Sequence, residues 1–196
     1  MLNLPNILTL SRIAIIPIVL ITFFFDSPAM RWTAVSLFTL AGITDFFDGH
    51  LARRANQVSR LGRFLDPIAD KLLVASVLLM LVGFNRVDVW SYIPAIIILL
   101  REILVSGLRE FLAELRVGVP VTKLAKGKTT LQMIALGFLI VGTTLPMVKS
   151  IGEVLLWIAA LLTLITGYDY LKAGLKHMGE PIPQSPSAGA KNDTET

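Results

Sequence analysis

Acidic residues recur at helical spacing in the first third of the chain, within sequence that is otherwise apolar. Asp45 and Asp48 are three residues apart, and Asp66 and Asp70 are four apart. Either spacing puts two side chains on one face of a helix. Four carboxylates brought into a small volume would repel one another strongly at a low effective dielectric constant. We therefore expect divalent cations between them.

The ligand chemistry narrows the choice of metal. The chain has no cysteine and only two histidines, which excludes thiolate sites and disfavours a multi-histidine zinc site. An all-oxygen set suits Mg²⁺, Mn²⁺ or Ca²⁺, and four carboxylates suffice for a two-metal centre that binds a phosphoryl group. Gly49 lets a phosphate approach the backbone closely, and the Arg53 guanidinium can bind one bidentately. These residues predict a metal-assisted site for a phosphate-bearing substrate.

The elements that position this site are predicted to be membrane-spanning helices. Of the 196 residues, 54% are hydrophobic and 16% are charged, whereas a soluble domain has about 25% charged residues. The surplus of apolar residues must face lipid, so we expect an all-α, polytopic membrane protein. Apolar runs predict six transmembrane helices, over Ile7–Phe25, from Trp32 to Phe47 or beyond, from Leu61–Asp66 to Phe84, from Tyr92 to Arg116, over Thr129–Leu145 and over Ile151–Leu171.

Six spans put both chain termini on one side of the membrane. All but three of the 18 basic residues fall on that side, in loops and adjoining helix ends, which leaves only Arg31, Arg86 and Lys149 for the opposite side. This bias predicts that both termini, the carboxylates and their polar, metal-containing cavity are cytoplasmic. It also explains the net charge of +4 without nucleic acid. We expect one membrane domain over residues 1–178 and a disordered tail over 179–196.

The motif resembles the signature of a known family. Asp45-x-x-Asp48-Gly49-x-x-Ala52-Arg53, followed by Gly62-x-x-x-Asp66-x-x-x-Asp70, matches the CDP-alcohol phosphotransferases at all eight fixed positions, which lie within 26 residues. Further blocks resemble the branch of that family whose acceptor is glycerol 3-phosphate. These blocks are Pro5–Arg12, Arg101-Glu102-Ile103 with Ser106 and Leu108-Arg109-Glu110, and Lys126-x-Lys128-Thr129-Thr130-x-Gln132-Met133.

The resemblance implies transfer of the phosphatidyl group of CDP-diacylglycerol to sn-glycerol 3-phosphate, with release of CMP, at the bacterial inner membrane. By analogy, Asp45, Asp48, Asp66 and Asp70 would hold two divalent cations, Mg²⁺ or Mn²⁺, and Asp70 would also be the general base. A homodimer among membrane lipids is implied as well. The residues implied to bind CDP-diacylglycerol are Asn6, Thr9, Gly49, Ala52, Arg53, Ser59 and Gly62.

A phosphorylated acceptor needs cations near the metals. The candidates are Arg101, Arg109, Lys126 and Lys128, among which Arg109 and Lys128 are preferred. Two other acceptors remain open at this stage, namely inositol phosphate, or phosphatidylglycerol as in a cardiolipin synthase. A cation transporter is disfavoured because the carboxylates cluster at one membrane face beside Arg53, which would hinder cation passage. A non-catalytic scaffold gives no reason for the carboxylate spacing.

Overall fold

The chain forms a bundle of long helices. The computed structural model describes residues 4–55, 60–114, 123–142 and 144–178. For residues 4–8, 45–55, 60–61, 63–64, 66, 114, 123–126, 173 and 176–178 it describes the backbone alone. The elements are α1 (Leu4–Thr22), α2 (Pro28–Ala55), α3 (Arg60–Gly83), the short 3₁₀ helix η1 (Val89–Ser91), α4 (Tyr92–Glu114), α5 (Lys123–Gly142) and α6 (Pro146–Met178). The all-α fold predicted from the sequence is confirmed for the described residues.

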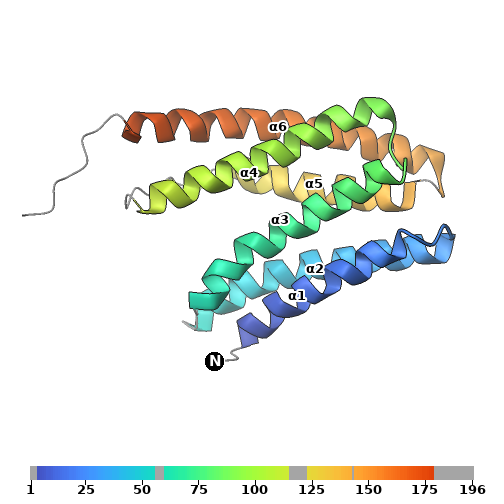
Figure 1. Ribbon diagram of the computed structural model, residues 1–196, viewed down its shortest axis with the longest axis horizontal. Coiled ribbons are helices and arrows are strands. Elements are labelled where there is room, and N and C mark those ends of the chain that lie inside the picture. Colours follow the sequence, from blue (N-terminus) through green and yellow to red (C-terminus); the bar gives the residue numbers. More distant parts are fainter. Residues whose placement is uncertain (1–3, 56–59, 115–122, 143, 179–196) are drawn as a thin grey trace, which may run out of the picture.

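The helices alternate in direction and divide into two halves (Figure 1). In the first half, α1 packs against both α2 and α3; in the second, α6 packs against both α4 and α5. Contacts of α2 with α5, and of α3 with α4 and α5, join the halves. The end of the bundle where α1 begins and α2 ends is called the motif end below, and the other is called the far end.

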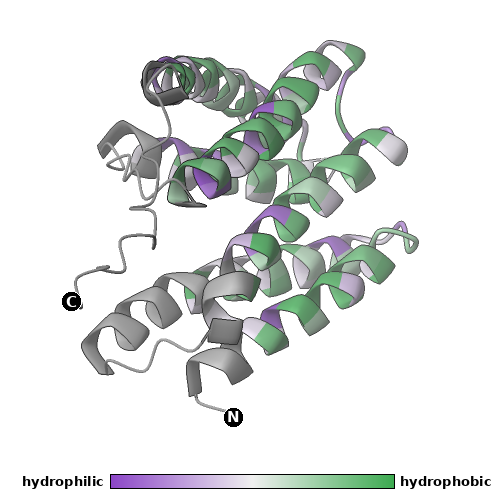
Figure 2. Cartoon of the chain, turned by 60° about the vertical axis from the view of Figure 1, so that its left-hand side comes forward, coloured by the Kyte–Doolittle hydropathy of each residue, from purple (hydrophilic) through white to green (hydrophobic). Residues whose placement is uncertain are grey.

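A buried apolar core runs between the halves. Phe38 of α2, Leu78 of α3, Ile98 of α4 and Leu136 of α5 are among its members, and each is at most 2% exposed. Large apolar side chains also cover the outside of the bundle, such as Leu79 and Ile103, which are 67% and 69% exposed. Hydrophobic residues predominate along the described helices (Figure 2). An apolar exterior of this kind is typical of a protein that contacts lipid.

Two helical stretches within the described residues are long and apolar enough to cross a membrane, Val89–Ala113 and Pro146–Lys172. Two shorter apolar helical stretches, Thr9–Thr22 and Gly127–Gly142, accompany them. These stretches support the six expected membrane spans only in part.

Three boundaries differ from the sequence predictions. The fifth span was expected to begin at Thr129, with a loop from Val117 to Lys128 before it, but α5 already begins at Lys123. Pro146 starts α6 instead of a turn, because proline fits the first position of a helix, where its missing N–H has no partner to lose. Helix α3 begins at Arg60, before the expected start between Leu61 and Asp66, so Pro67 lies inside the helix.

Local chemistry fixes the turns at the far end. After α3, Asn85 adopts a left-handed conformation with φ of 51°. The Arg86 N–H then bonds to the Leu81 carbonyl at 2.9 Å, and the Asn85 N–H bonds to the Val82 carbonyl at 3.1 Å. This pair of bonds is the Schellman motif that ends many helices. The buried Arg86 guanidinium also donates to the Phe23 carbonyl at 3.1 Å. This bond gives a hydrogen-bond partner to the backbone carbonyl that directly follows α1.

Candidate active site

The helical hairpin of α2 and α3 carries the acidic motif to the motif end. Because α2 continues to Ala55, the backbone from Asp45 to Arg53 is a single helical stretch. Asp45 lies ten residues before the end of α2, and Asp70 lies ten residues after the start of α3. At 1.5 Å per residue, both are about 15 Å from their helix ends. Asp48 and Asp66 lie seven and six residues from those ends, so the two helices carry their carboxylates at matched depths.

Only part of the predicted site can be followed to its side chains. Asp70, Thr9, Gly62, Arg101, Arg109 and Lys128 are described. The side chains of Asn6, Asp45, Asp48, Gly49, Ala52, Arg53, Asp66 and Lys126, and the whole of Ser59, lie outside the described residues. The roles assigned to all of these residues stay predictions.

Asp70 lies at the interface of α1 and α3. Its carboxylate Oδ1 accepts a hydrogen bond from Nη1 of Arg12 at 3.1 Å. The Arg12 side chain is fully buried, whereas that of Asp70 is 52% exposed. Thr9, one helical turn before Arg12, is also buried. Helix α1 therefore presents buried polar side chains to the acidic motif, a role that the sequence pattern alone had not given to Arg12.

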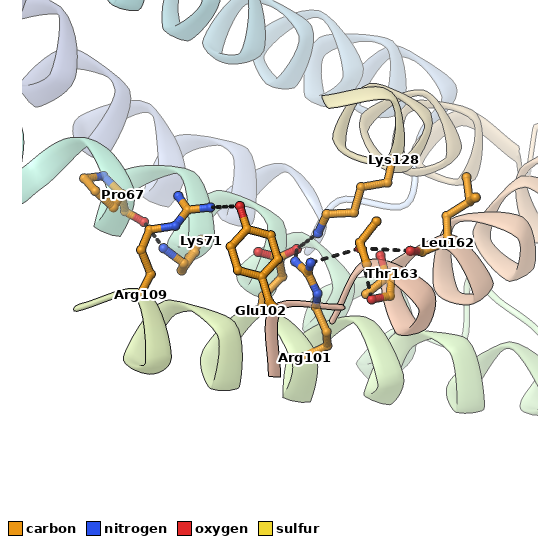
Figure 3. Close-up of polar contacts among 10 residues, drawn as sticks. Pro67, Lys71, Arg101, Glu102, Arg109, Lys128, Leu162 and Thr163 are labelled. Atoms are coloured by element: carbon orange, nitrogen blue, oxygen red, sulfur yellow. Dashed lines mark hydrogen bonds and ion pairs between the residues drawn. The ribbon is translucent and has the colours of Figure 1, made fainter. Parts of the chain in front are cut away.

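A second polar cluster joins α4, α5 and α6 (Figure 3). Arg101 of α4 and Lys128 of α5 are 8% and 3% exposed, and both donate to the same oxygen, Oε1 of Glu102. The Arg101–Glu102 bond is 3.3 Å long. A buried cation is stable only when it is paired, and Glu102 pairs two. Its carboxylate therefore fixes α5 against α4 at the point where both cations were predicted to bind a phosphate.

Arg109 and Lys71 continue the cluster toward the acidic motif. Arg109 donates to the hydroxyl of Tyr170 at 3.4 Å, and its guanidinium carbon lies 5.6 Å from the centre of the Tyr170 ring. Lys71 of α3 lies beside Arg109 in Figure 3 and donates to the Pro67 carbonyl at 3.0 Å. Lys71 directly follows Asp70 in the chain. The basic cluster thus reaches from α5 across α4 to the residue next to the expected base.

The balance of charge in this cluster favours an anion. The cluster contains four basic side chains, Lys71, Arg101, Arg109 and Lys128 (Figure 3). Three carboxylates, those of Glu102, Asp70 and Glu110, lie close enough to interact with Lys71, so basic groups still outnumber acidic ones. Three of the cations come from second-half helices and one from α3. A phosphate dianion offers both the charge and the acceptor oxygens that such a set can bind.

The chemistry of the ligand atoms supports the expected binding of divalent cations by the acidic motif. Four carboxylates at matched depth on α2 and α3, in a chain without cysteine, form the hard oxygen set that Mg²⁺ and Mn²⁺ prefer. Among the residues whose side chains are described, no group of three acidic or histidine residues is arranged to hold a metal. Of the four expected metal ligands, Asp70 is the one whose side chain the structure describes.

Sequence reasoning missed the partners that hold the basic residues. Glu102, Thr166 and Tyr170 were not proposed as site residues. Glu102 and Thr166 accept hydrogen bonds from Arg101, and Tyr170 accepts one from Arg109. Thr166 and Tyr170 are four residues apart in an apolar helix, so they share one face of α6. Polar groups on one face of an apolar span are the signal that could have identified them.

An α-helical bundle with this motif and a basic cluster at one end defines a class of membrane phosphotransferase. The family model of the CDP-alcohol phosphatidyltransferases matches residues 2–165, and the chain belongs to this family. The resemblance predicted from the motif is confirmed.

Similar proteins agree on one activity. A relative from Rickettsia bellii is 54% identical over 178 residues, which cover 89% of this chain and 97% of the relative. A relative from Cereibacter sphaeroides is 39% identical over 214 aligned positions, 90% of this chain and 97% of the relative. One from Shigella flexneri serotype 5b is 42% identical over 173 residues, 87% and 94% of the two chains. Each is named CDP-diacylglycerol–glycerol-3-phosphate 3-phosphatidyltransferase.

Proposed function

We propose that this protein transfers the phosphatidyl group of CDP-diacylglycerol to sn-glycerol 3-phosphate and releases CMP. The observation that carries the proposal is the basic cluster of Arg101, Arg109 and Lys128 at the end of the bundle that holds the acidic motif. The family accounts for a CDP-linked donor, and the named activity of the relatives accounts for the acceptor. Inositol phosphate and phosphatidylglycerol, the other acceptors considered, have no such support.

In the proposed reaction, a hydroxyl oxygen of glycerol 3-phosphate attacks the phosphorus that bears the lipid. The bond from that phosphorus to the oxygen of CMP breaks, and CMP leaves. The hydroxyl proton passes to the Asp70 carboxylate, which is half exposed and therefore accessible to a substrate. Arg12 orients this carboxylate through its 3.1 Å hydrogen bond. The basic cluster of Lys71, Arg101, Arg109 and Lys128 binds the acceptor phosphate and brings the hydroxyl into line.

Two divalent cations, Mg²⁺ or Mn²⁺, would be held by Asp45, Asp48, Asp66 and Asp70, where they offset the charge of the diphosphate. The residues proposed to hold the CDP-diacylglycerol head are Asn6, Thr9, Gly49, Ala52, Arg53, Ser59 and Gly62. Lys126 would join the acceptor site from the first turn of α5.

The whole bundle is proposed to lie in the membrane as six spans with the motif end in the cytoplasm. The apolar exterior and the two long apolar helices support membrane insertion. The distribution of basic residues supports the orientation. The membrane domain over residues 1–178, the tail over 179–196 and a homodimer stay predictions. The tail lies outside the described part of the chain.

The function is tested by product analysis on purified protein in lipid nanodiscs. With CDP-diacylglycerol, glycerol 3-phosphate and Mg²⁺ or Mn²⁺, we expect CMP and phosphatidylglycerophosphate in equal amounts. Asp70→Asn should lower kcat by roughly 100-fold or more, because general bases contribute that much. The control is Asp169→Asn, which changes an exposed aspartate of α6 and should leave kcat unaltered.

Absence of CMP release with glycerol 3-phosphate and either metal would overturn the proposed function. If CMP is released with inositol phosphate or phosphatidylglycerol and not with glycerol 3-phosphate, that alcohol is the acceptor and the proposed one is wrong. Full turnover by Asp70→Asn would remove Asp70 from the role of base while leaving the activity intact.

A further inference from the structure

Helix α6 carries none of the family motif, yet its polar residues face both arginines of α4. Thr166 is 2% exposed and Tyr170 is 4% exposed. Both lie in the apolar stretch Pro146–Lys172. Buried polar groups in an apolar helix are costly unless they have a defined partner, and here the partners are Arg101 and Arg109.

Thr166 is oriented to accept a hydrogen bond from Arg101. Its hydroxyl oxygen donates to the carbonyl of Leu162 at 2.9 Å or that of Thr163 at 3.2 Å, within its own helix. With the hydroxyl hydrogen directed along α6, the oxygen lone pairs point outward, where Nη2 of Arg101 donates to them at 3.0 Å (Figure 3). The threonine therefore fixes one edge of the Arg101 guanidinium, while Glu102 binds the other nitrogen.

Gly167 leaves room for the Arg101 side chain. A Cβ atom at this position would lie 3.0 Å from Cγ and 3.2 Å from Nε of Arg101. Glycine is disfavoured inside a helix, so a packing reason is expected, and the Arg101 stem supplies it. Without a side chain at residue 167, Arg101 can lie flat against α6 and reach Thr166.

Tyr170 fixes Arg109 from the same face of α6. Its ring packs with Val105, Leu108 and Leu112 of α4 in a small apolar cluster. The packed ring cannot swing, so its hydroxyl holds a fixed position and accepts the hydrogen bond from Arg109. The ring face also lies near the guanidinium, which adds a cation–π attraction.

We propose that α6 is the element that positions the acceptor site, with Thr166 and Gly167 holding Arg101 and Tyr170 holding Arg109. This inference rests on the proposed function and assigns its acceptor selectivity to residues outside the motif. An arginine loses much conformational freedom when it binds a phosphate. Holding it beforehand removes that cost from the binding step. Positioning of this kind affects the acceptor and leaves the lipid donor untouched.

Two glycines of α6 provide a matched test. Gly167→Ala should raise the KM for glycerol 3-phosphate by about fivefold or more, with the KM for CDP-diacylglycerol unchanged. The control is Gly152→Ala on the same helix. Its new methyl would lie 2.9 Å from Cγ of Leu139, an equally tight contact with α5 that involves neither arginine nor Tyr170. We expect Gly152→Ala to lower the melting temperature and to leave both KM values at the wild-type level.

Two nearly isosteric changes test the proposal without adding volume. Thr166→Val and Tyr170→Phe each remove one hydroxyl acceptor and should each raise the KM for glycerol 3-phosphate alone. The controls are Thr163→Val, whose buried hydroxyl has no hydrogen-bond partner among the described residues, and Tyr168→Phe, whose side chain is 67% exposed. In an Arg101→Ala background, Thr166→Val should cause no further change in that KM.

The outcomes separate the two proposals. If the wild type releases no CMP with glycerol 3-phosphate, the proposed function fails and this inference fails with it. If the wild type is active and Gly167→Ala, Thr166→Val and Tyr170→Phe keep its acceptor KM, the function stands and the role of α6 is wrong. Equal rises in both KM values, or an effect of Gly152→Ala matching that of Gly167→Ala, would show general loosening of the helix packing and also overturn the proposal.

Discussion

Glu102 shows how a single carboxylate can organise a basic site. It pairs with Arg101 next to it in α4 and with Lys128 of α5, which are both buried. Two cations close together would repel each other, and the shared carboxylate offsets that repulsion. An acceptor phosphate bound as proposed would add negative charge to a cluster in which basic groups outnumber acidic ones. Glu102 thus keeps the cations in place without neutralising all of them.

Lys128→Ala is expected to weaken acceptor binding more than donor binding. A hydrogen bond to a charged group contributes about 1.5–3 kcal/mol, which corresponds to a rise of roughly 10- to 100-fold in the KM for glycerol 3-phosphate. Steady-state kinetics with each substrate varied in turn measure this effect. Lys172→Ala, an exposed lysine near the same end of the bundle, is the control. Equal rises in both KM values would remove Lys128 from the acceptor site.

The sequence pointed to the proposed site residues but not to the side chains that hold them in place. Asp70, Arg101, Arg109 and Lys128 were proposed from the motif, from charge and from the family resemblance. Their partners were missed because Arg12 is 58 residues from Asp70, and Tyr170 is 61 residues from Arg109. No local pattern reports a contact across such a separation; only helix packing brings these side chains together.

At the scale of the helix, the sequence predicted which segments are helical but not where each helix begins and ends. Apolar runs identified all six long helices of the described residues. The start of α5 was missed because Lys123, Lys126 and Lys128 look like loop residues to a hydropathy pattern, although lysine is a good helix former. The extension matters because it makes Lys128 part of a rigid helix, where Glu102 can hold it.

Ion pairs at the far end connect α6 to the segment that precedes η1. The Lys149 ammonium donates to Asp88 Oδ1 at 2.5 Å, and the Asp88 N–H donates to Glu153 Oε1 at 2.7 Å. The hydrogen bond from Lys149 lowers the pKa of the Asp88 carboxyl below its ordinary value of 3.8. Because the folded-state pKa is depressed, the pair stabilises the fold above the ordinary pKa and this contribution is lost as the pH falls through the folded-state value.

Asp88→Asn should therefore lower the melting temperature of the detergent-purified protein slightly at pH 7. The difference from the wild type should shrink as the pH falls below the ordinary pKa of 3.8, and it should disappear once the pH is below the lower folded-state pKa, where the carboxylate is protonated in the folded protein as well. It should also shrink in high salt, because Asp88 is exposed and its ion pair is screened. A difference that persisted at low pH would mean that the carboxylate charge is not the cause.

For the whole molecule, the proposed orientation can be tested along one helix. Met147 and Leu175 lie near opposite ends of α6, are 78% and 57% exposed, and are 28 residues apart. That separation is about 42 Å along the helix, more than the ~30 Å hydrocarbon core of a bilayer. Because the chain has no cysteine, Met147→Cys and Leu175→Cys each introduce a single thiol.

In intact cells, a membrane-impermeant maleimide should label the Met147→Cys protein directly. It should label the Leu175→Cys protein only after the membrane is permeabilised. The reverse pattern would place the motif end outside the cell and contradict the orientation, whereas labelling of both thiols in intact cells would show that α6 does not span the membrane.

The division of the bundle into two three-helix halves has an evolutionary consequence. The acidic motif proposed to recognise the donor lies on α2 and α3. Apart from Lys71 of α3, the proposed acceptor residues Arg101, Arg109 and Lys128 and the α6 residues that contact them lie on α4–α6. Substitutions that retune the choice of alcohol can therefore accumulate in the second half while the first half stays under separate selection. A shared nucleotide-lipid module could in this way be combined with diverging alcohol modules, so that one ancestral bundle gives rise to enzymes for different phospholipids.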